Sequence, residues 1–281
     1  VLERREAPAG ILQIADRDFD AALARLVGGW VEAEPAAPVI ASGMIGSRQG
    51  WLEAPYVPCP AGIDQLAETL VSLVSQTGHR VSIVPGLSTE NSAGAPDVMR
   101  GEETQIIGAL TRDGSRQIFV LPGTHSKWVE AIDNKIVRFA TFMTGEIFAV
   151  LSEHSILGRT MKGYADDVDG FRHGYDYAMN DAVNSAGLLQ QLFSARTLAL
   201  FHRIPEEALH AYLSGLLIGS ELRGALGIFG RGIDVTIIAE PALAYRYQRA
   251  LAYAKIPANL AADDAASMGL FRLARAAGLL K

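Results

Sequence analysis

The sequence predicts an α/β fold, because strand-like and helix-like segments alternate along the chain. Residues 39–41 form a short apolar run that ends in a turn-prone Ser-Gly pair, as expected for a buried strand leading into a loop. Residues 64–75 place leucines at helical spacing, and residues 81–84 form a β-branched run that stops at a Pro-Gly pair. The order strand, helix, strand is the first indication of the fold class.

The alternation continues through the middle of the chain. Residues 102–111 have helical character with acidic residues in the first turn, and residues 117–121 are β-rich. Residues 126–143 are expected to form two strands, because Asp133-Asn134 suits a tight turn between antiparallel partners. A β-hairpin is therefore predicted directly after the strand at 117–121.

From Gly145 onward the chain is predicted to be rich in helices. Apolar residues recur at helical spacing over residues 206–226 and 265–279. Between them, residues 234–239 form a β-branched strand that leads through a proline into a helix, and proline is well tolerated in a first helical turn. Although no Gly-, Ser- or Pro-rich linker marks a boundary, we expect two sheet-containing lobes, residues 1–116 and 117–281.

Composition argues against several classes of protein. With 281 residues, of which 49% are hydrophobic, the chain can bury a sizeable core. The net charge of −6, with no cluster of Lys and Arg, argues against a nucleic-acid partner. No apolar run approaches the roughly 20 residues that span a bilayer, so no membrane partner is expected. The single cysteine, Cys59, fits a reducing, cytoplasmic location.

Residues 121–128, LPGTHSKW, lie between two expected strands and form the first candidate site. A turn that holds Gly123 and Thr124 exposes backbone N–H groups and a hydroxyl, which can cradle phosphate oxygens, and Lys127 adds a positive charge. The alternative is an ordinary hairpin loop with Gly for its geometry and Ser or Thr for turn hydrogen bonds. The sequence holds neither the Walker pattern nor the G-x-G-x-x-G fingerprint.

Residues 97–105, DVMRGEETQ, form a second candidate at the start of an expected helix. Glu102 and Glu103 could deprotonate a hydroxyl, and Arg100 could hold an anionic substrate. The alternative is structural, because acidic residues in a first helical turn favour the helix dipole and cap the helix. In that case Arg100 only pairs with the acidic residues.

Residues 41–51, ASGMIGSRQGW, form a third candidate. Three glycines let the backbone approach a ligand closely, while Arg48 and Trp51 offer a cation and a stacking surface. A flexible surface loop is the competing interpretation. The six histidines fall into no zinc-ligand spacing, so we predict no transition metal.

Six motifs occur in order along the chain: ASGMIGSRQGW at 41–51, IVPGL at 83–87, VMRGEETQ at 98–105, LPGTHSKWV at 121–129, TGE at 144–146 and SGLLIGSEL at 214–222. Together they resemble the 2-dehydro-3-deoxygalactonokinase family of the actin-like ATPase superfamily. The resemblance spans nearly the whole chain. Six ordered matches are more specific than any single one.

The resemblance implies ATP- and Mg²⁺-dependent phosphorylation of 2-dehydro-3-deoxy-D-galactonate at its 6-hydroxyl, a step of galactonate breakdown. It also implies two actin-like, ribonuclease H-like lobes with a ligand cleft between them. The lobe 1–116 would bind the sugar acid and carry the catalytic base. The lobe 117–281 would bind ATP, and its last helix could pack back on the first lobe.

The same resemblance implies roles for individual residues. Glu102 takes the place of the catalytic base, with Glu103 as the reserve candidate. The sugar acid would contact Gly43, Met44, Ser47, Arg48, Trp51 and Arg100. ATP would contact Gly123, Thr124, His125, Lys127 and, where the superfamily has its adenosine loop, Ala239 and Glu240. The usual glycines of that last loop are replaced here.

The sequence departs from the family pattern at its start. Family members begin with a strand that ends in an Asp-x-Gly-[ST] turn, the first phosphate loop, and no such motif precedes Ile11. The sequence also starts without methionine. We therefore expect that the initial strands of the first lobe are missing from this sequence and present in the full gene product.

Two other functions stay open at this point. The chain could be a kinase of the same superfamily that acts on another sugar acid or sugar. It could also be a non-catalytic relative that senses a metabolite, an alternative that the missing phosphate loop supports. The expected partners are a small-molecule sugar acid and ATP, and a homo-oligomer stays open.

Overall fold

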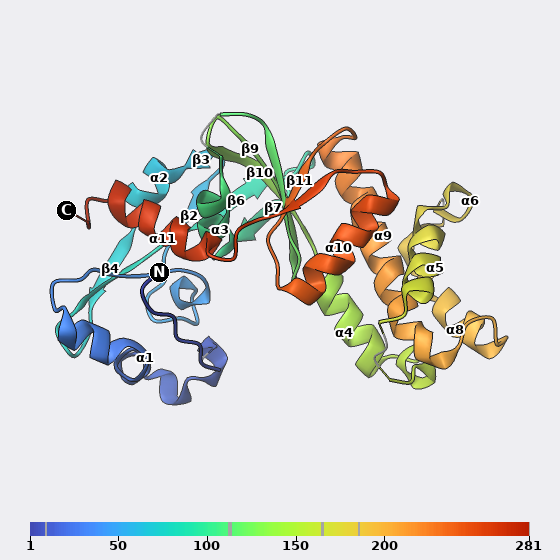
Figure 1. The fold of residues 1–281 in the computed structure, drawn as a ribbon, viewed down its shortest axis with the longest axis horizontal. Coiled ribbons are helices and arrows are strands. Elements are labelled where there is room, and N and C mark those ends of the chain that lie inside the picture. Colours follow the sequence, from blue (N-terminus) through green and yellow to red (C-terminus); the bar gives the residue numbers. More distant parts are fainter. Residues whose placement is uncertain (9, 112–113, 164–165, 185, 281) are drawn as a thin grey trace. The chain divides into compact units, whose positions relative to one another are not determined.

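The computed structural model describes all residues except 9, 112–113, 164–165, 185 and 281. The chain divides into two compact units. The first unit comprises Val1–Gln117, Val129–Phe139 and Ala261–Lys281, and the second comprises Ile118–Trp128 and Ala140–Leu260. Both contain strands and helices, which confirms the predicted α/β class (Figure 1).

The first unit is built on two three-stranded sheets, in the orders β1-β5-β4 and β2-β6-β7. In each sheet the central strand has one parallel and one antiparallel neighbour. Short 3₁₀ helices lie at Ile11–Gln13, Ala15–Arg17 and Met44–Gly46. The longer elements are α1 (Phe19–Ala33), β1 (Val39–Ala41), β2 (Tyr56–Pro58), β3 (Ala61–Gly62), α2 (Ile63–Glu68), β4 (Val71–Val74), β5 (Arg80–Ile83), β6 (Gly86–Glu90), β7 (Pro96–Met99), α3 (Glu102–Ala109) and α11 (Ala265–Ala276).

The predicted helix at 64–75 is wrong in its second half. Helix α2 ends at Glu68, and residues 71–74 form strand β4 instead. This strand pairs antiparallel with β5, with Val71 opposite Ile83 and Leu73 opposite Val81. The β-branched and leucine side chains of this segment therefore pack as one strand of a sheet, and tertiary pairing overrides the helical spacing.

Helix α3 is fixed by α11, which comes from the end of the chain (Figure 1). The two helices touch at their backbones, because a Cβ on Gly108 would overlap the Ala265 carbonyl and a Cβ on Gly269 would overlap the Thr104 carbonyl. Arg272 Nη1 of α11 also donates hydrogen bonds to the last carbonyl groups of α3, those of Ile107 (2.6 Å) and Leu110 (3.2 Å). Helix α11 thus satisfies carbonyl groups that a helix end leaves without partners.

The second unit combines three parallel strands with most of the helices. Its strands β12, β11 and β8 run parallel in that order, and β9 lies next to β8. Short 3₁₀ helices lie at Gly158–Thr160 and Glu206–Ala208. The longer elements are β8 (Gln117–Leu121), α4 (Thr144–His154), α5 (Val168–Met179), α6 (Asp181–Asn184), α7 (Gly187–Leu192), α8 (Ser194–Leu200), α9 (Leu209–Phe229), β11 (Val235–Ile237), α10 (Pro241–Tyr253) and β12 (Ala258–Leu260).

Strands β9 (Ser126–Ile132) and β10 (Lys135–Phe142) form the predicted hairpin, and both contribute residues to each unit. Asp133 and Asn134 have φ angles of 52° and 59°, the left-handed values that a two-residue hairpin turn of this kind requires. The turn prediction is therefore confirmed.

Helix α9 is the centre of the second unit. It is buried along almost its whole length, and α5 packs beside it (Figure 1). A helix that is apolar on all sides is expected in a protein interior. Within the described part of the chain, no helix is long and apolar enough to cross a membrane.

The backbone contact between α3 and α11 gives a stability prediction. Gly269→Ala should lower the free energy of unfolding by roughly 1–3 kcal/mol, because the new methyl group forces the two helices apart. Thermal unfolding followed by circular dichroism measures the change. Gly28→Ala is the control, since a Cβ at this position in α1 meets nothing within 4 Å and alanine favours a helix. Equal melting temperatures for wild type and Gly269→Ala would contradict the close contact.

Candidate active site

The loop between β8 and β9, residues 122–125, holds the Gly-Thr pair found in the sequence. The first turn of α4 packs directly against it, and the Glu146 N–H donates to the Thr124 carbonyl (3.0 Å). A Cβ at position 145 would overlap the Gly123 carbonyl oxygen. Only glycine at position 145 permits this approach, so the loop and the helix start form one local structure.

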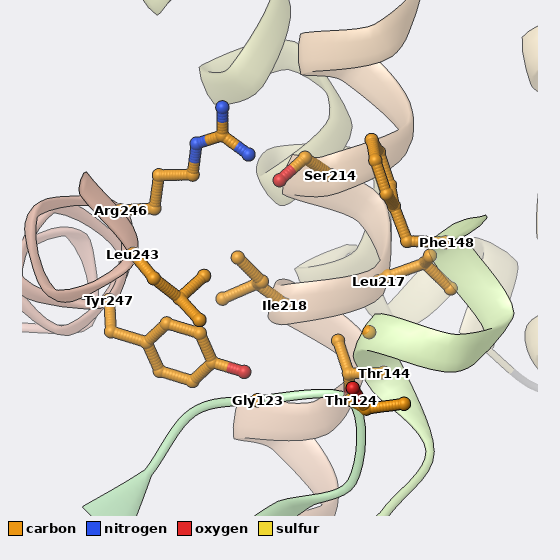
Figure 2. Close-up of a pocket in the computed structure, with 11 residues that line it drawn as sticks. Gly123, Thr124, Thr144, Phe148, Ser214, Leu217, Ile218, Leu243, Arg246 and Tyr247 are labelled. Carbon is orange, nitrogen blue, oxygen red and sulfur yellow. The ribbon is translucent and has the colours of Figure 1, made fainter. Parts of the chain in front are cut away.

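A cavity of about 230 Å³ opens beside this loop (Figure 2). Its walls come from the loop, α4, α9 and α10. Most of the lining surface is apolar, with polar groups from a few side chains, which is the usual composition of a small-molecule pocket. The lining residues are Gly123, Thr124, Thr144, Gly145, Phe148, Ser214, Leu217, Ile218, Leu243, Arg246 and Tyr247.

Arg246 of α10 gives this cavity its positive charge. Its side chain extends along one wall, with Ser214 and Phe148 on the opposite side (Figure 2). Among the described residues, no hydrogen bond or ion pair engages its guanidinium group. A cation in this position can bind an anionic group or lie over an aromatic ring.

His125 and Lys127 support the loop but do not line the cavity. The His125 ring lies 2.5 Å from the Glu146 carboxylate, measured from Nε2 to Oε2, and its side chain is 50% exposed. Lys127 is buried in β9, and its Nζ donates to the His125 carbonyl (3.1 Å). Both side chains therefore act on the conformation of the loop.

Ala239 and Glu240 lie directly before α10. Ala239 packs against the apolar core of the second unit, and the Glu240 carbonyl accepts the first backbone hydrogen bond of the helix, from Ala244 (2.9 Å). Neither residue lines the cavity, whose contacts with α10 begin at Leu243. The two residues thus start the helix that carries Arg246 into the cavity wall.

The acidic turn lies in the first unit, at the start of α3. Glu102 accepts a hydrogen bond from the Arg100 N–H (3.0 Å), and Glu103 accepts one from the Gly101 N–H (2.7 Å). Glu103 is fully buried, and this burial raises the pKa of its carboxyl group to about 7, although its hydrogen bonds favour the ionised form. Glu102 is partly exposed, so a ligand can reach it more easily.

Arg100 has an unusual environment beside this turn. Its guanidinium lies 4.4 Å from the centre of the Tyr56 ring, and Nη2 donates to the Ala54 carbonyl (2.7 Å). Nε and Nη1 are buried without a hydrogen-bond partner among the described residues. Buried donors without partners are costly, so these two N–H groups favour an anionic ligand.

Part of the loop at 43–51 lies against this arginine. A Cβ on Gly46 would come within 3.1 Å of Arg100 Nη1, and a Cβ on Gly101 would come within 3.1 Å of the Gly43 Cα. The structure therefore brings Gly43, Arg100 and the acidic turn of α3 together. This arrangement depends on glycine, because larger residues would displace the guanidinium group.

The other residues predicted in this loop have different surroundings. Met44 is 51% exposed, and the Ser47 hydroxyl donates to its carbonyl (2.8 Å). The Arg48 side chain is 89% exposed, with Glu53 at 3.9 Å. Trp51 stacks on Phe19 with ring centres 6.2 Å apart. The structure thus does not gather these side chains around Arg100.

Several cavity residues were not singled out from the sequence. Thr144, Phe148, Ser214 and Arg246 belong to three different helices, far apart in the chain. The motifs TGE at 144–146 and SGLLIGSEL at 214–222 contain two of these residues and were the available signal. Arg246 lies in no motif, and only the folded chain brings it to the cavity.

The fold is shared with a solved structure. A crystal structure of a Sinorhizobium meliloti protein, described as a candidate 2-dehydro-3-deoxygalactonokinase, matches with a TM-score of 0.85 and 35% sequence identity. The match covers 98% of this chain and 91% of that chain. The α/β architecture is therefore one that a sugar-acid kinase candidate also has.

The family follows from the sequence matches. A family model described as 2-keto-3-deoxy-galactonokinase matches residues 1–273. The 2-dehydro-3-deoxygalactonokinase of Escherichia coli (strain K12) is 36% identical over 249 residues, which is 89% of this chain and 81% of that protein. A Rhizobium meliloti (strain 1021) protein named as a probable 2-dehydro-3-deoxygalactonokinase, DgoK1, is 36% identical over 283 residues, which covers 98% of this chain and 90% of that protein.

The chain belongs to the 2-keto-3-deoxy-galactonokinase family. This confirms the family predicted from the six motifs, and it supports a carbohydrate kinase with ATP as its co-substrate.

The buried Glu103 gives a prediction on pH. Because the pKa of its carboxyl group rises from 4.5 to about 7 on folding, the folded chain holds a proton that the unfolded chain has lost between these pH values. Stability should therefore fall as pH rises from 5 to 8, by about 3 kcal/mol from this residue. Urea unfolding of wild type and Glu103→Gln at both pH values isolates the effect. If the free energy of unfolding changed equally with pH in wild type and Glu103→Gln, Glu103 would not be the source of the pH dependence.

Proposed function

We propose that this chain transfers the γ-phosphoryl group of ATP to the 6-hydroxyl of 2-dehydro-3-deoxy-D-galactonate. The observation that carries the proposal is the family match over residues 1–273. Two local structures support it: a Gly-Thr loop beside a cavity in the second unit, and an Arg-Glu turn in the first unit. Phosphoryl transfer needs such a pair of sites, one for the phosphates and one for the acceptor.

The second unit would bind ATP. Gly123 and Thr124 would hold the β- and γ-phosphates through backbone N–H groups and a hydroxyl, next to the first turn of α4. The cavity beside them suits the adenosine part, because its walls are largely apolar and Arg246 can lie over a purine ring. In this proposal His125 and Lys127 keep the loop in place, and Ala239 and Glu240 start the helix that forms one wall.

Mg²⁺ is part of the proposal. When bound with ATP, the ion would neutralise charge on the phosphate oxygens during transfer. Mg²⁺ in kinases keeps several waters and is bound mainly by phosphates with one or two carboxylates. Among the described residues no group of three His, Cys, Asp or Glu side chains could hold a metal ion. The phosphates of ATP and bound water would supply most of its ligands.

The first unit would bind the sugar acid. Arg100 would bind its carboxylate, because its guanidinium group lies beside the acidic turn of α3 and the residue is partly exposed. Guanidinium groups match carboxylates well because two N–H groups can bind two oxygens. Gly43 and Gly46 would let the loop backbone close on the substrate, with Met44, Ser47, Arg48 and Trp51 as the remaining predicted contacts.

Glu102 would act as the base that takes the proton from the 6-hydroxyl. Its position at the start of α3 and its partial exposure favour it over Glu103, which is fully buried. A raised pKa is common in catalytic bases, and this keeps Glu103 as the reserve candidate. Burial without access to substrate explains the pKa of Glu103 equally well.

Several finer predictions from the sequence stay predictions. They are two actin-like lobes with a ligand cleft, a sugar-acid lobe at 1–116 and an ATP lobe at 117–281, a homo-oligomer, and a cytoplasmic location. Transfer requires that the hydroxyl and the γ-phosphoryl group meet, and closure of two such lobes would exclude water from the reaction.

ADP formation tests the proposed function directly. The protein is incubated with Mg-ATP and 2-dehydro-3-deoxy-D-galactonate, and with a panel of other sugar acids and sugars. Selective turnover of 2-dehydro-3-deoxy-D-galactonate supports the proposal, and selective turnover of another compound reassigns the substrate. Binding of the sugar acid without turnover would favour a metabolite sensor.

A catalytic base at Glu102 predicts a separation of binding and turnover. Glu102→Gln should lower kcat roughly 10²- to 10⁴-fold, because the amide cannot accept the proton, while the sugar acid still binds. Turnover is measured by ADP release and binding by isothermal titration calorimetry. Near-normal turnover in Glu102→Gln together with a large loss in Glu103→Gln would assign the base to Glu103.

Arg100 predicts a different kinetic pattern. Arg100→Gln should raise KM for the sugar acid roughly 10- to 100-fold, because a charge-assisted hydrogen bond to the carboxylate is lost. KM for ATP should stay unchanged. Arg80→Gln, at an exposed position of β5 in the same unit, is the control. An unchanged KM for the sugar acid in Arg100→Gln would place the carboxylate elsewhere.

A further inference from the structure

The carboxylate of Glu221, in the middle of α9, lies in the interior of the second unit, with 3% of the residue exposed. Its Oε1 accepts hydrogen bonds from Ser126 Oγ (2.7 Å) and Trp128 Nε1 (2.8 Å). Its Oε2 accepts hydrogen bonds from Tyr247 Oη (2.6 Å) and from Thr144 Oγ1. An ionised carboxylate has about four acceptor positions and no donor, so these four donors saturate it.

The four donors come from the elements around the cavity beside the loop at 122–125. Ser126 and Trp128 lie in β9, directly after the loop at 122–125. Thr144 is the first residue of α4, and Tyr247 lies on α10; both line the cavity (Figure 2). Glu221 itself is not among the lining residues. It therefore connects the loop, the start of α4 and the wall of α10 without reaching the cavity.

We propose that Glu221 is a positioning residue for ATP, an inference that rests on the proposed function. Its four hydrogen bonds fix the loop at 122–125 relative to α4 and α10, so that the phosphate-binding N–H groups and the adenosine cavity keep one geometry. A displacement of about 1 Å in such a site can lower the rate as much as 100-fold. The effect should fall on ATP and leave the sugar acid unaffected.

The alternative is that Glu221 only stabilises the fold and does not affect how ATP binds. Burial raises the pKa of Glu221, since an ionised carboxylate loses its hydration there, and its hydrogen bonds oppose this shift. Apolar side chains often stabilise an interior as well as a buried charge does, which makes a positional role the better explanation. A residue with only a structural role would change the melting temperature and leave both KM values unaltered in the folded molecules.

The test is Glu221→Gln, which keeps the shape but turns one acceptor oxygen into a donor that faces groups already donating. We expect KM for ATP and the Kd for Mg-ADP to rise roughly 10- to 100-fold. KM for the sugar acid should stay within about twofold of the wild-type value. Glu207→Gln, an exposed glutamate near the start of α9, is the matched control and should leave all values unchanged.

Ser126→Ala is the second variant. If Glu221→Gln does not fold, Ser126→Ala still tests whether the hydrogen bonds of Glu221 position the loop for ATP. Ser126 donates to Glu221 but does not line the cavity, so a selective rise in the Kd for Mg-ADP would have to act through the loop. Unchanged ATP values in the folded variants, or an equal rise in both KM values, would overturn the proposal.

The two proposals fail in different ways. A wild-type protein that binds Mg-ADP but phosphorylates no sugar acid contradicts the proposed function, and the Mg-ADP comparison of the variants still decides the role of Glu221. A wild-type protein that binds no Mg-ADP overturns the role of Glu221 as well.

Discussion

The hydrogen bonding of one buried carboxylate constrains the second unit. Glu221 loses its hydration inside the unit, and an ionised carboxylate is stable there only if donors replace the lost water. Segments that lie between 26 and 95 residues from Glu221 in the sequence must therefore converge on it: Ser126 and Trp128 from β9, Thr144 from α4 and Tyr247 from α10. Two of these donors, Thr144 and Tyr247, also line the cavity beside the Gly-Thr loop, so their hydrogen bonds to Glu221 help to shape its walls.

In the first unit, close packing between two helices, and not a buried carboxylate, holds the candidate site residues in position. The acidic turn of α3 carries the proposed base, and α3 is short, so its position depends on its neighbours. Helix α11, from the far end of the chain, presses its backbone against α3 and binds the last carbonyl groups of α3 through Arg272. Close backbone packing at glycines and satisfied helix ends together hold Glu102 and Arg100 where a sugar acid could meet them.

Local patterns predicted much of the fold, because they depend on neighbouring residues. The Asp133-Asn134 turn, the strand before it and the long apolar helix α9 all follow from spacing and turn chemistry. Residues 71–74 were predicted as helix from their spacing but form a strand, because pairing with β5 decides their structure. For the proposed site, the sequence predicts the Gly-Thr loop and the Arg-Glu turn, and it does not point to Arg246 or Glu221. Arg246 lies in no motif. Glu221 lies in the motif SGLLIGSEL, but its contacts are with distant segments, and only the folded chain shows them.

The central claim is that ATP binds in the second unit with its phosphates on the Gly-Thr loop. A crystal structure of the protein with Mg²⁺ and a non-hydrolysable ATP analogue tests it most directly. We predict the β- and γ-phosphates at the N–H groups of Gly123 and Thr124, and the adenosine part in the cavity beside Arg246 and Phe148. An analogue bound away from this loop, with the cavity empty, would contradict this binding mode.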